Sequence, residues 1–450
     1  MTDHQKKAIL DNIAIIPAEE LFASYILTGD ITLSDMMHTG NLEASKRRKI
    51  EELITKENAR EEEAWTHAKT SASIDAYNDF LREFPHGNHS LMAEALRDNL
   101  IQVKENSLNN KKHILDKIKY NSNDEFTPKV IKDLIDSKEI ALSDLKEIGI
   151  PEMVLDKLMN FREPVLTLGI APESIPDGYT EVYFWGSPGS GKTCALSGIL
   201  SYMHNDGIFS TDGGSGYHYM NQLTNIFSKE IGALPAATTT EVTQYLPFKL
   251  TDDKKEKHPI ALIELSGEIF ECYYYMAAGL PLPSTKHVKT FETLTNYLAG
   301  PNKKVHFFVI DLSKDPHAQD EKGMCLYNYL DAAQKYFKNT DIFRKSTDAL
   351  YIIATKSDLL NCHENQRLDE AAQFLKNHYA AFVNVLKDAC ATYKINDNNE
   401  LKVIPFSLGN VYFNKICQFN SKTSRQVVQI LQQKTAKEIK RSGLGKFLNS

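Results

Sequence analysis

The stretch WGSPGSGKT, residues 185–193, decides how the C-terminal part of this chain folds. Residues 186–193 satisfy the pattern GxxxxGK[ST], the apolar run EVYFW precedes them, and a helical pattern follows. Glycines at these positions let backbone N–H groups turn inward around a phosphate chain, and the N-terminus of a helix adds its dipole. The stretch therefore predicts a strand, a phosphate-binding loop and a helix, in that order.

Each part of this loop has an expected role. Lys192 is expected to reach the β- and γ-phosphates of a nucleoside triphosphate, and the Thr193 hydroxyl is expected to ligate Mg²⁺. The predicted phosphate-binding residues are Gly186, Ser187, Pro188, Gly189, Ser190, Gly191, Lys192, Thr193 and Cys194.

From about residue 178 to the C-terminus, apolar runs alternate with stretches of helical length, which indicates a sheet covered by helices on both faces. The connection 251–257 is charged and too short for a crossover helix, so the strands on either side of it are expected to form an antiparallel hairpin. The predicted strands are Glu181–Trp185, Thr243–Leu250, Ile260–Leu265, Val305–Leu312, Ala349–Ala354 and Leu401–Phe406.

Three further segments stand in the order found in the Ras-like P-loop GTPase superfamily, and each resembles one of its motifs. ELSGE (264–268) resembles DxxG, TKSD (355–358) resembles [NT]KxD, and SLG (407–409) resembles the weaker loop that meets the guanine O6 atom. The resemblance implies an α/β fold with a mixed, mostly parallel sheet and one antiparallel hairpin. It also implies GTP or GDP as the ligand and Mg²⁺ as the cofactor.

In the first of these motifs, the resemblance implies that the N–H of Gly267 meets the γ-phosphate and that Glu268 orients the attacking water. With Lys192, these are the candidate catalytic residues. Glu264 replaces the usual aspartate and is expected to hold the Mg²⁺ shell through water, beside Thr193. Because Glu264 and Glu268 both depart from the family pattern, a nucleotide-binding scaffold without efficient turnover stays open as an alternative.

In the second and third motifs, the expected role is base recognition. The Asp358 carboxylate can accept hydrogen bonds from both the N1–H and the 2-amino group of guanine, which adenine does not offer. The Lys356 stem is expected to pack on the base, while Thr355, Ser407 and Leu408 complete the nucleotide-binding set. A P-loop ATPase with an adaptor domain is the alternative if guanine is not preferred.

The switch I threonine, which would ligate Mg²⁺ and meet the γ-phosphate, is expected among Thr238, Thr239 and Thr240. The sequence does not distinguish these three, and Thr239 serves as the working assignment. No arginine occurs between Arg162 and Arg344, so the switch segments contain no internal arginine finger. Hydrolysis is therefore expected to be slow unless a partner or self-association accelerates it.

Residues 1–165 read as helices with short polar breaks, and they predict an all-α interaction or sensor module before the P-loop domain at 178–450. The stretches ITLSD (31–35) and IALSD (140–144) resemble each other and suggest duplicated helix-turn-helix units. Between them, aromatic residues around Pro85-x-Gly87 resemble a tetratricopeptide hairpin, although an ordinary helical hairpin with its aromatics in the core fits the same pattern.

Composition limits the partners and the compartment. A net charge of -7 gives no broad basic footprint, so no nucleic acid is expected. No segment approaches the roughly 18 apolar residues of a membrane span, and the six scattered cysteines suggest reduced thiols. The expectation is a cytoplasmic GTPase switch with a protein partner, an architecture similar to bacterial signalling and conflict systems.

Overall fold

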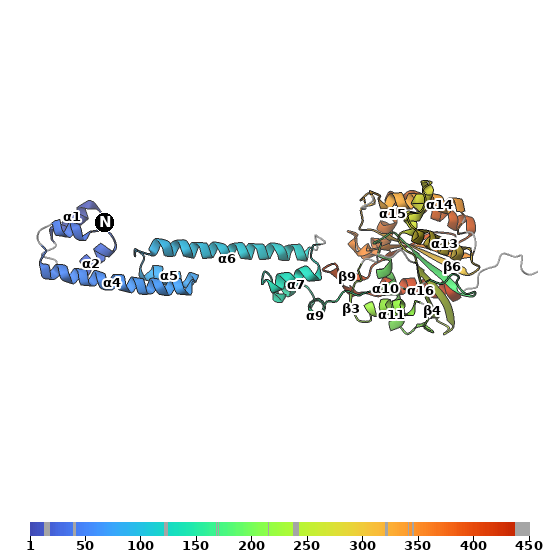
Figure 1. Ribbon diagram of the computed structural model, residues 1–450, viewed down its shortest axis with the longest axis horizontal. Coiled ribbons are helices and arrows are strands. Elements are labelled where there is room, and N and C mark those ends of the chain that lie inside the picture. Colours follow the sequence, from blue (N-terminus) through green and yellow to red (C-terminus); the bar gives the residue numbers. More distant parts are fainter. Residues whose placement is uncertain are drawn as a thin grey trace, which may run out of the picture. The chain divides into compact units, whose positions relative to one another are not determined.

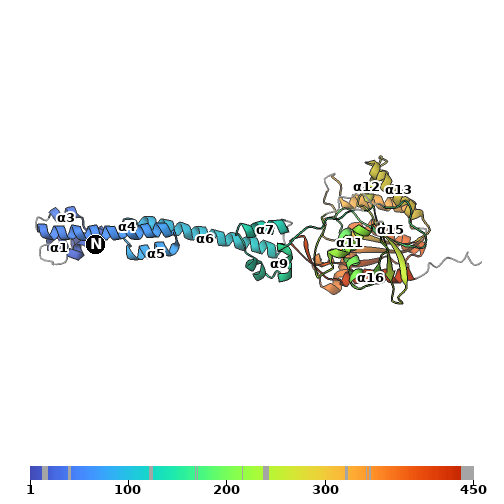
Figure 2. The same cartoon turned by 60° about the horizontal axis from the view of Figure 1, so that its bottom comes forward.

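The computed structural model describes residues 1–12, 19–38, 42–120, 125–167, 169, 171–214, 216–236, 243–319, 323–340, 342–343 and 346–436. It forms two compact units, Met1–Asp116 and Lys117–Ser450 (Figures 1 and 2). The two domains expected from the sequence, 1–165 and 178–450, stay a proposal. The last helices of the predicted helical module, those after residue 117, belong to the second unit.

The first unit is helical. Its helices bury apolar side chains in two clusters, one around Phe22 and one around Trp65, and this packing stabilises them more than intrinsic propensity does. Its elements are α1 (Asp3–Asp11), α2 (Glu19–Leu27), α3 (Leu33–His38), α4 (Ala44–Ser71), α5 (Ile74–Glu83) and α6, which starts at Ser90 and runs on to Lys119.

The hairpin of α4 and α5 buries its aromatic residues, which fits a tetratricopeptide hairpin and an ordinary helical hairpin alike. Trp65, Tyr77 and Phe80 lie in one core cluster. Glu61 in α4 is buried, and its carboxylate accepts a hydrogen bond from the N–H of His89 at 3.0 Å. A Cβ atom on Gly87 would lie 2.4 Å from the same carboxylate, so a larger residue there would displace the Glu61 side chain.

The two similar stretches have the same local structure. Asp35 accepts a hydrogen bond from the N–H of Thr32 at 2.8 Å, and Asp144 accepts one from the N–H of Ala141 at 2.7 Å. Each stretch follows a short helix and continues into another. In the second unit these helices are α7 (Pro128–Asp136), α8 (Leu142–Glu147) and α9 (Glu152–Met159).

The second unit contains the predicted sheet, in the strand order β2-β4-β5-β1-β6-β7-β8. β1, β5, β6, β7 and β8 are parallel, while β4 is antiparallel to both β5 and β2. The expected fold class, a mixed and mostly parallel sheet with an antiparallel hairpin, is confirmed. The strands are β1 (Thr180–Trp185), β2 (Phe209–Ser210), β4 (Gln244–Thr251), β5 (Lys257–Glu264), β6 (Lys303–Asp311), β7 (Thr347–Thr355) and β8 (Lys402–Phe406).

Helices cover both faces of this sheet (Figure 1). α10 (Lys192–Asn205), α11 (Tyr217–Ile226) and α16 (Lys422–Ala436) share a core with one face. The other face packs against α12 (Ile269–Ala277), α13 (Thr285–Ala299), α14 (Leu326–Thr340) and α15 (Arg367–Tyr393). Because both faces are covered, the central strands are continuous apolar runs instead of alternating ones.

A small second sheet was not predicted. It contains β3 (Ile231–Ala233), β10 (Ile416–Phe419) and β9 (Gly409–Tyr412), in that order. Phe413 and Asn414, at φ of 51° and 57°, form the turn between β9 and β10. These strands have only three or four residues and no clear alternation of apolar and polar residues, so the sequence did not predict them.

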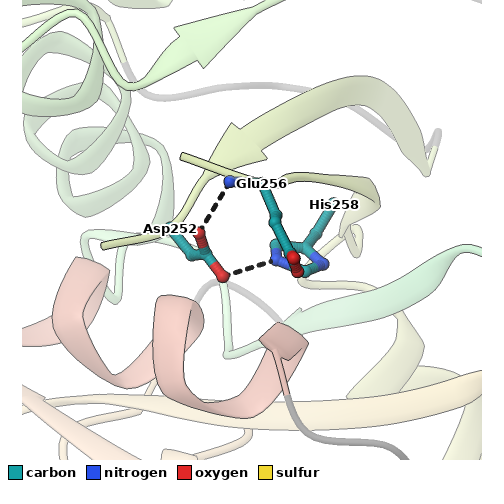
Figure 3. A group of neighbouring side chains, drawn as sticks. All are labelled: Asp252, Glu256 and His258. Carbon is teal, nitrogen blue, oxygen red and sulfur yellow. Dashed lines mark hydrogen bonds and ion pairs between the residues drawn. The ribbon is translucent and has the colours of Figure 1, made fainter. Parts of the chain in front are cut away.

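The hairpin of β4 and β5 is closed by Asp252 (Figure 3). One of its carboxylate oxygens accepts the N–H groups of Lys254 and Glu256 at 2.9 and 2.8 Å, and the other lies 3.0 Å from Nε2 of His258. The hydrogen bond to His258 is the main cause that lowers the pKa of Asp252. These contacts give the group a structural role at the hairpin tip.

Within the described ranges, none of the helices combines the length and the apolar character that crossing a bilayer requires.

Candidate functional site

The predicted motifs converge because they follow neighbouring parallel strands. The loop 186–191 follows β1, the segment 264–268 ends β5, and the segment 355–358 ends β7. β5 and β6 flank β1, and β7 lies between β6 and β8. The carboxyl ends of parallel strands meet at one edge of a sheet, which is where ligands of open α/β sheets bind.

The loop after β1 needs its glycines. Gly189 and Gly191 have φ of 69° and 86°, in the left-handed region that glycine adopts without a steric penalty. A Cβ atom on Gly186 would lie 2.8 Å from the carbonyl oxygen of Val309 in β6. The backbone therefore folds tightly over the start of α10, as a phosphate-binding loop does.

Lys192 lies at the base of this loop. Its Nζ donates hydrogen bonds to the carbonyl oxygens of Gly186 and Ser187 at 2.6 and 3.0 Å. Burial lowers the pKa of Lys192 to about 8; the charge of Glu264 opposes this change and that of Lys314 adds to it.

Thr193 and Glu264 are in direct contact. The Thr193 hydroxyl donates to one carboxylate oxygen of Glu264 at 2.5 Å, and the hydroxyl of Tyr219 donates to the other at 2.6 Å. Burial raises the pKa of Tyr219, and the negative charge of Glu264 adds to the effect. Tyr219 was missed because it is one of twenty tyrosines, in a segment that carries no motif.

Gly267 packs directly on the phosphate loop. A Cβ atom there would lie 2.4 Å from the backbone nitrogen of Pro188. The next residue, Glu268, has a carboxylate oxygen 3.5 Å from Nε2 of His287, a buried residue of α13. His287 in turn contacts the hydroxyl of Ser284 through Nδ1 at 2.8 Å. Nothing in the sequence pattern pointed to His287.

The TKSD segment is tied to the phosphate loop. The Thr355 hydroxyl donates to the carbonyl oxygen of Ser190 at 2.8 Å, and Nζ of Lys356 lies 2.9 Å from the carboxylate of Asp311. Asp311 is fully buried at the end of β6. Asp358 is half-buried and makes no hydrogen bond or ion pair with any residue that the structure describes.

The loop after β8 lies beside the TKSD segment, since Thr355 and Phe406 are paired in register. The Ser407 carbonyl accepts a hydrogen bond from the Thr423 hydroxyl at 2.5 Å, and Leu408 packs over Gly198 of α10. Burial raises the pKa of the Cys194 thiol to about 11, so this side chain is an unreactive part of the loop helix.

The switch I candidates Thr238, Thr239 and Thr240 lie outside the described residues.

Comparison with known proteins found no matching family model and no matching curated protein. Among solved structures, the GTPase-like domain of S. cerevisiae Ski7 bound to GTP is 17% identical, with a TM-score of 0.30 over 58% of this chain and 51% of that chain. A Sulfolobus solfataricus GTP-binding protein with GDP is 14% identical, with a TM-score of 0.24 over 68% and 62%. The SRb-GTP/SRX complex from Chaetomium thermophilum gives 14% identity and a TM-score of 0.27 over 56% and 99%.

This chain thus spans about half of the Ski7 chain. Likenesses of this size carry no argument about its ligand or activity. The resemblance to Ras-like P-loop GTPases rests on the chain's own motifs and on the sheet edge that brings them together.

Proposed function

We propose that this chain is a guanine-nucleotide switch that binds GTP and GDP, hydrolyses GTP slowly, and couples its nucleotide state to a protein partner. One observation carries the proposal: three segments far apart in the sequence meet at the phosphate loop. Thr193 contacts Glu264, Gly267 packs on Pro188, and Thr355 binds the Ser190 carbonyl.

The residues around the loop suit a magnesium nucleotide. The Thr193 hydroxyl and the Glu264 carboxylate offer the oxygen ligands that Mg²⁺ prefers. The ion, when bound, neutralises charge on the phosphate oxygens. Lys192 lies where its ammonium can exchange the two loop carbonyls for phosphate oxygens. Asp358, which has no partner in the described part of the chain, is assigned to guanine N1–H and the 2-amino group.

An interaction role for the helical module is supported by a cavity of about 540 Å³ within the first unit. It lies between α2, α4 and the turn at residues 84–88.

Self-association is tested by size-exclusion chromatography of the protein loaded with GDP or with a non-hydrolysable GTP analogue. A switch should change its oligomeric state or its partner binding between the two forms.

The base assignment is tested by titration with fluorescent GDP and ADP in the presence of Mg²⁺. We expect a preference for GDP on the order of 100-fold or more, because a site built to hydrogen-bond one base leaves its polar groups unpaired with the other. Asp358→Ala should abolish the preference, while Asp369→Ala, an exposed position on α15, should keep it. Equal binding of both nucleotides would favour an ATPase, and absence of any guanosine phosphate binding would refute the proposal.

A nucleotide-binding scaffold without efficient turnover is the second candidate. The contact between Glu268 and His287 favours it, because it engages the side chain assigned to orient water. Hydrolysis by the wild type is compared with Lys192→Ala and Glu268→Ala. Activity no higher than the Lys192→Ala background would favour the scaffold, and a rate that depends on Glu268 would favour the GTPase.

A further inference from the structure

Lys314 lies against the phosphate loop, although it stands 121 residues after Thr193 in the sequence. Its Nζ donates a hydrogen bond to the carbonyl oxygen of Pro188 at 3.1 Å. The same Nζ would be 2.8 Å from a Cβ atom on Gly189. The ammonium group therefore sits over the outer side of the loop, whereas Lys192 sits at its base.

The backbone before Lys314 is held in place. Asp311 is fully buried, and one of its carboxylate oxygens accepts hydrogen bonds from the N–H and the hydroxyl of Ser313 at 2.8 and 2.7 Å. Its other oxygen lies 2.9 Å from Nζ of Lys356. The turn that presents Lys314 is thus built into the end of β6 and linked to the TKSD segment.

Lys314 also faces the groups assigned to the γ-phosphate. It lines a cavity of about 540 Å³ together with Ser187, Pro188, Gly267 and Glu268. Within the described residues, no carboxylate lies at ion-pairing distance from its Nζ, and Lys314 is the one basic residue that lines this cavity. A cation here faces the space between the loop and the residue assigned to the attacking water.

We propose, building on the proposed GTPase function, that Lys314 is an internal catalytic cation: its ammonium exchanges the Pro188 carbonyl for γ-phosphate oxygens of GTP. In the reaction, the water oxygen bonds to the γ-phosphorus while the bond to the β–γ bridging oxygen breaks. The electron pair stays on GDP, and the proton lost by the water ends on the released phosphate. Lys314 transfers no proton; it stabilises the negative charge of the transferring group.

This position explains how a site without an arginine between Arg162 and Arg344 can still place a cation beside the phosphates. A lysine presents a point charge and not the planar fork of arginine. Its effect should therefore be smaller than the roughly 10³- to 10⁵-fold contribution of an arginine finger. A partner can still add to the rate.

The test compares wild type, Lys314→Met, Lys314→Arg and the matched control Lys338→Met, an exposed lysine of α14 in the same connection between β6 and β7. Single-turnover GTP hydrolysis should slow roughly 10- to 100-fold in Lys314→Met. It should be largely kept in Lys314→Arg and unchanged in Lys338→Met. Affinity for GDP should stay within about threefold, while affinity for a non-hydrolysable GTP analogue should fall at least about fivefold.

The outcomes separate this inference from the function on which it rests. If wild type binds no guanosine phosphate, the proposed function fails, and the inference fails with it. If wild type binds both nucleotides but Lys314→Met changes neither hydrolysis nor the ratio of triphosphate to diphosphate affinity, only the inference fails. An equal loss of GDP and triphosphate affinity would show that Lys314 merely shapes the loop, and would also overturn it.

Discussion

The hydroxyl of Tyr219 in α11 donates a hydrogen bond to the buried carboxylate of Glu264 at the end of β5, at 2.6 Å. The other oxygen of the same carboxylate is held by Thr193. The carboxylate proposed to organise Mg²⁺ is thus fixed from two sides, by the loop helix and by a helix that belongs to no sequence motif.

Replacing Tyr219 by phenylalanine tests this contact. Tyr219→Phe keeps the ring but removes a hydrogen bond to a buried charged group, which should lower the free energy of unfolding by about 1.5–3 kcal/mol. Urea denaturation of the nucleotide-free protein measures the change. Tyr379→Phe is the matched control, because the buried Tyr379 hydroxyl has no hydrogen-bond partner among the described residues. A loss as large in the control would show that the partner is irrelevant.

Gly267 is expected to tolerate no side chain. In Gly267→Ala the new methyl group would meet the backbone of Pro188, so this segment must move away from the phosphate loop. A displacement of about 1 Å can cost on the order of 100-fold in rate, and GTP hydrolysis should fall by at least tenfold. Gly169→Ala, whose Cβ atom would make ordinary contacts, should hydrolyse GTP normally. Unchanged hydrolysis by Gly267→Ala would contradict the role assigned to this segment.

His287 is expected to restrain Glu268. If about 1 kcal/mol must be spent to break their contact before Glu268 can orient water, then His287→Leu should raise the hydrolysis rate about fivefold. Single-turnover assays measure this, with Lys289→Ala on the exposed side of the same helix as control. A slower His287→Leu enzyme would instead mean that His287 positions Glu268 productively.

His306 should make the fold sensitive to acid. It is fully buried, Nδ1 accepts a hydrogen bond from Nε1 of Trp185 at 3.0 Å, and burial lowers its pKa to about 3, with the charge of Lys304 adding to the effect. Between pH 6.5 and 3 the unfolded chain binds a proton at this histidine that the folded chain does not. The free energy of unfolding should therefore fall as the pH falls, by up to about 1.4 kcal/mol per pH unit.

The quantity to compare between variants is the change in unfolding free energy with pH, and not the unfolding free energy at one pH. The difference between the unfolding free energies at pH 7 and pH 5 should be smaller in His306→Gln than in the wild type. Glutamine keeps an acceptor for Trp185 but does not titrate. His218→Gln, at an exposed position of α11, should keep the wild-type slope. Identical slopes in all three proteins would mean that other groups dominate the acid response.

Much of the central sheet could be predicted because its strands are long and apolar. The predicted strand Val305–Leu312 corresponds to β6 (Lys303–Asp311), and the predicted hairpin corresponds to β4 and β5. β2, with two residues, and the small sheet of β3, β9 and β10 carry no comparable period, and tertiary pairing alone forms them.

The site divides in the same way. The contiguous motifs 186–193, 264–268 and 355–358 could be predicted, because in each of them one loop supplies several groups at fixed spacing. The structure brings all three to one edge of the sheet. The assignments within them stay predictions until nucleotide binding is measured. A single side chain contributed from a distant element leaves no local sequence pattern. The sequence therefore did not predict a role for Tyr219, His287, Asp311 or Lys314.

By itself, the sequence determined that the chain contains a glycine-rich loop between a strand and a helix, followed by apolar strands that require cover on both faces. Those features depend on local backbone geometry and on the periodicity of apolar residues, which short stretches encode. Only the tertiary structure decided which side chains surround the loop. Parallel strands bring residues more than a hundred positions apart to one edge, so Lys314 reaches the Pro188 carbonyl and Thr355 reaches Ser190.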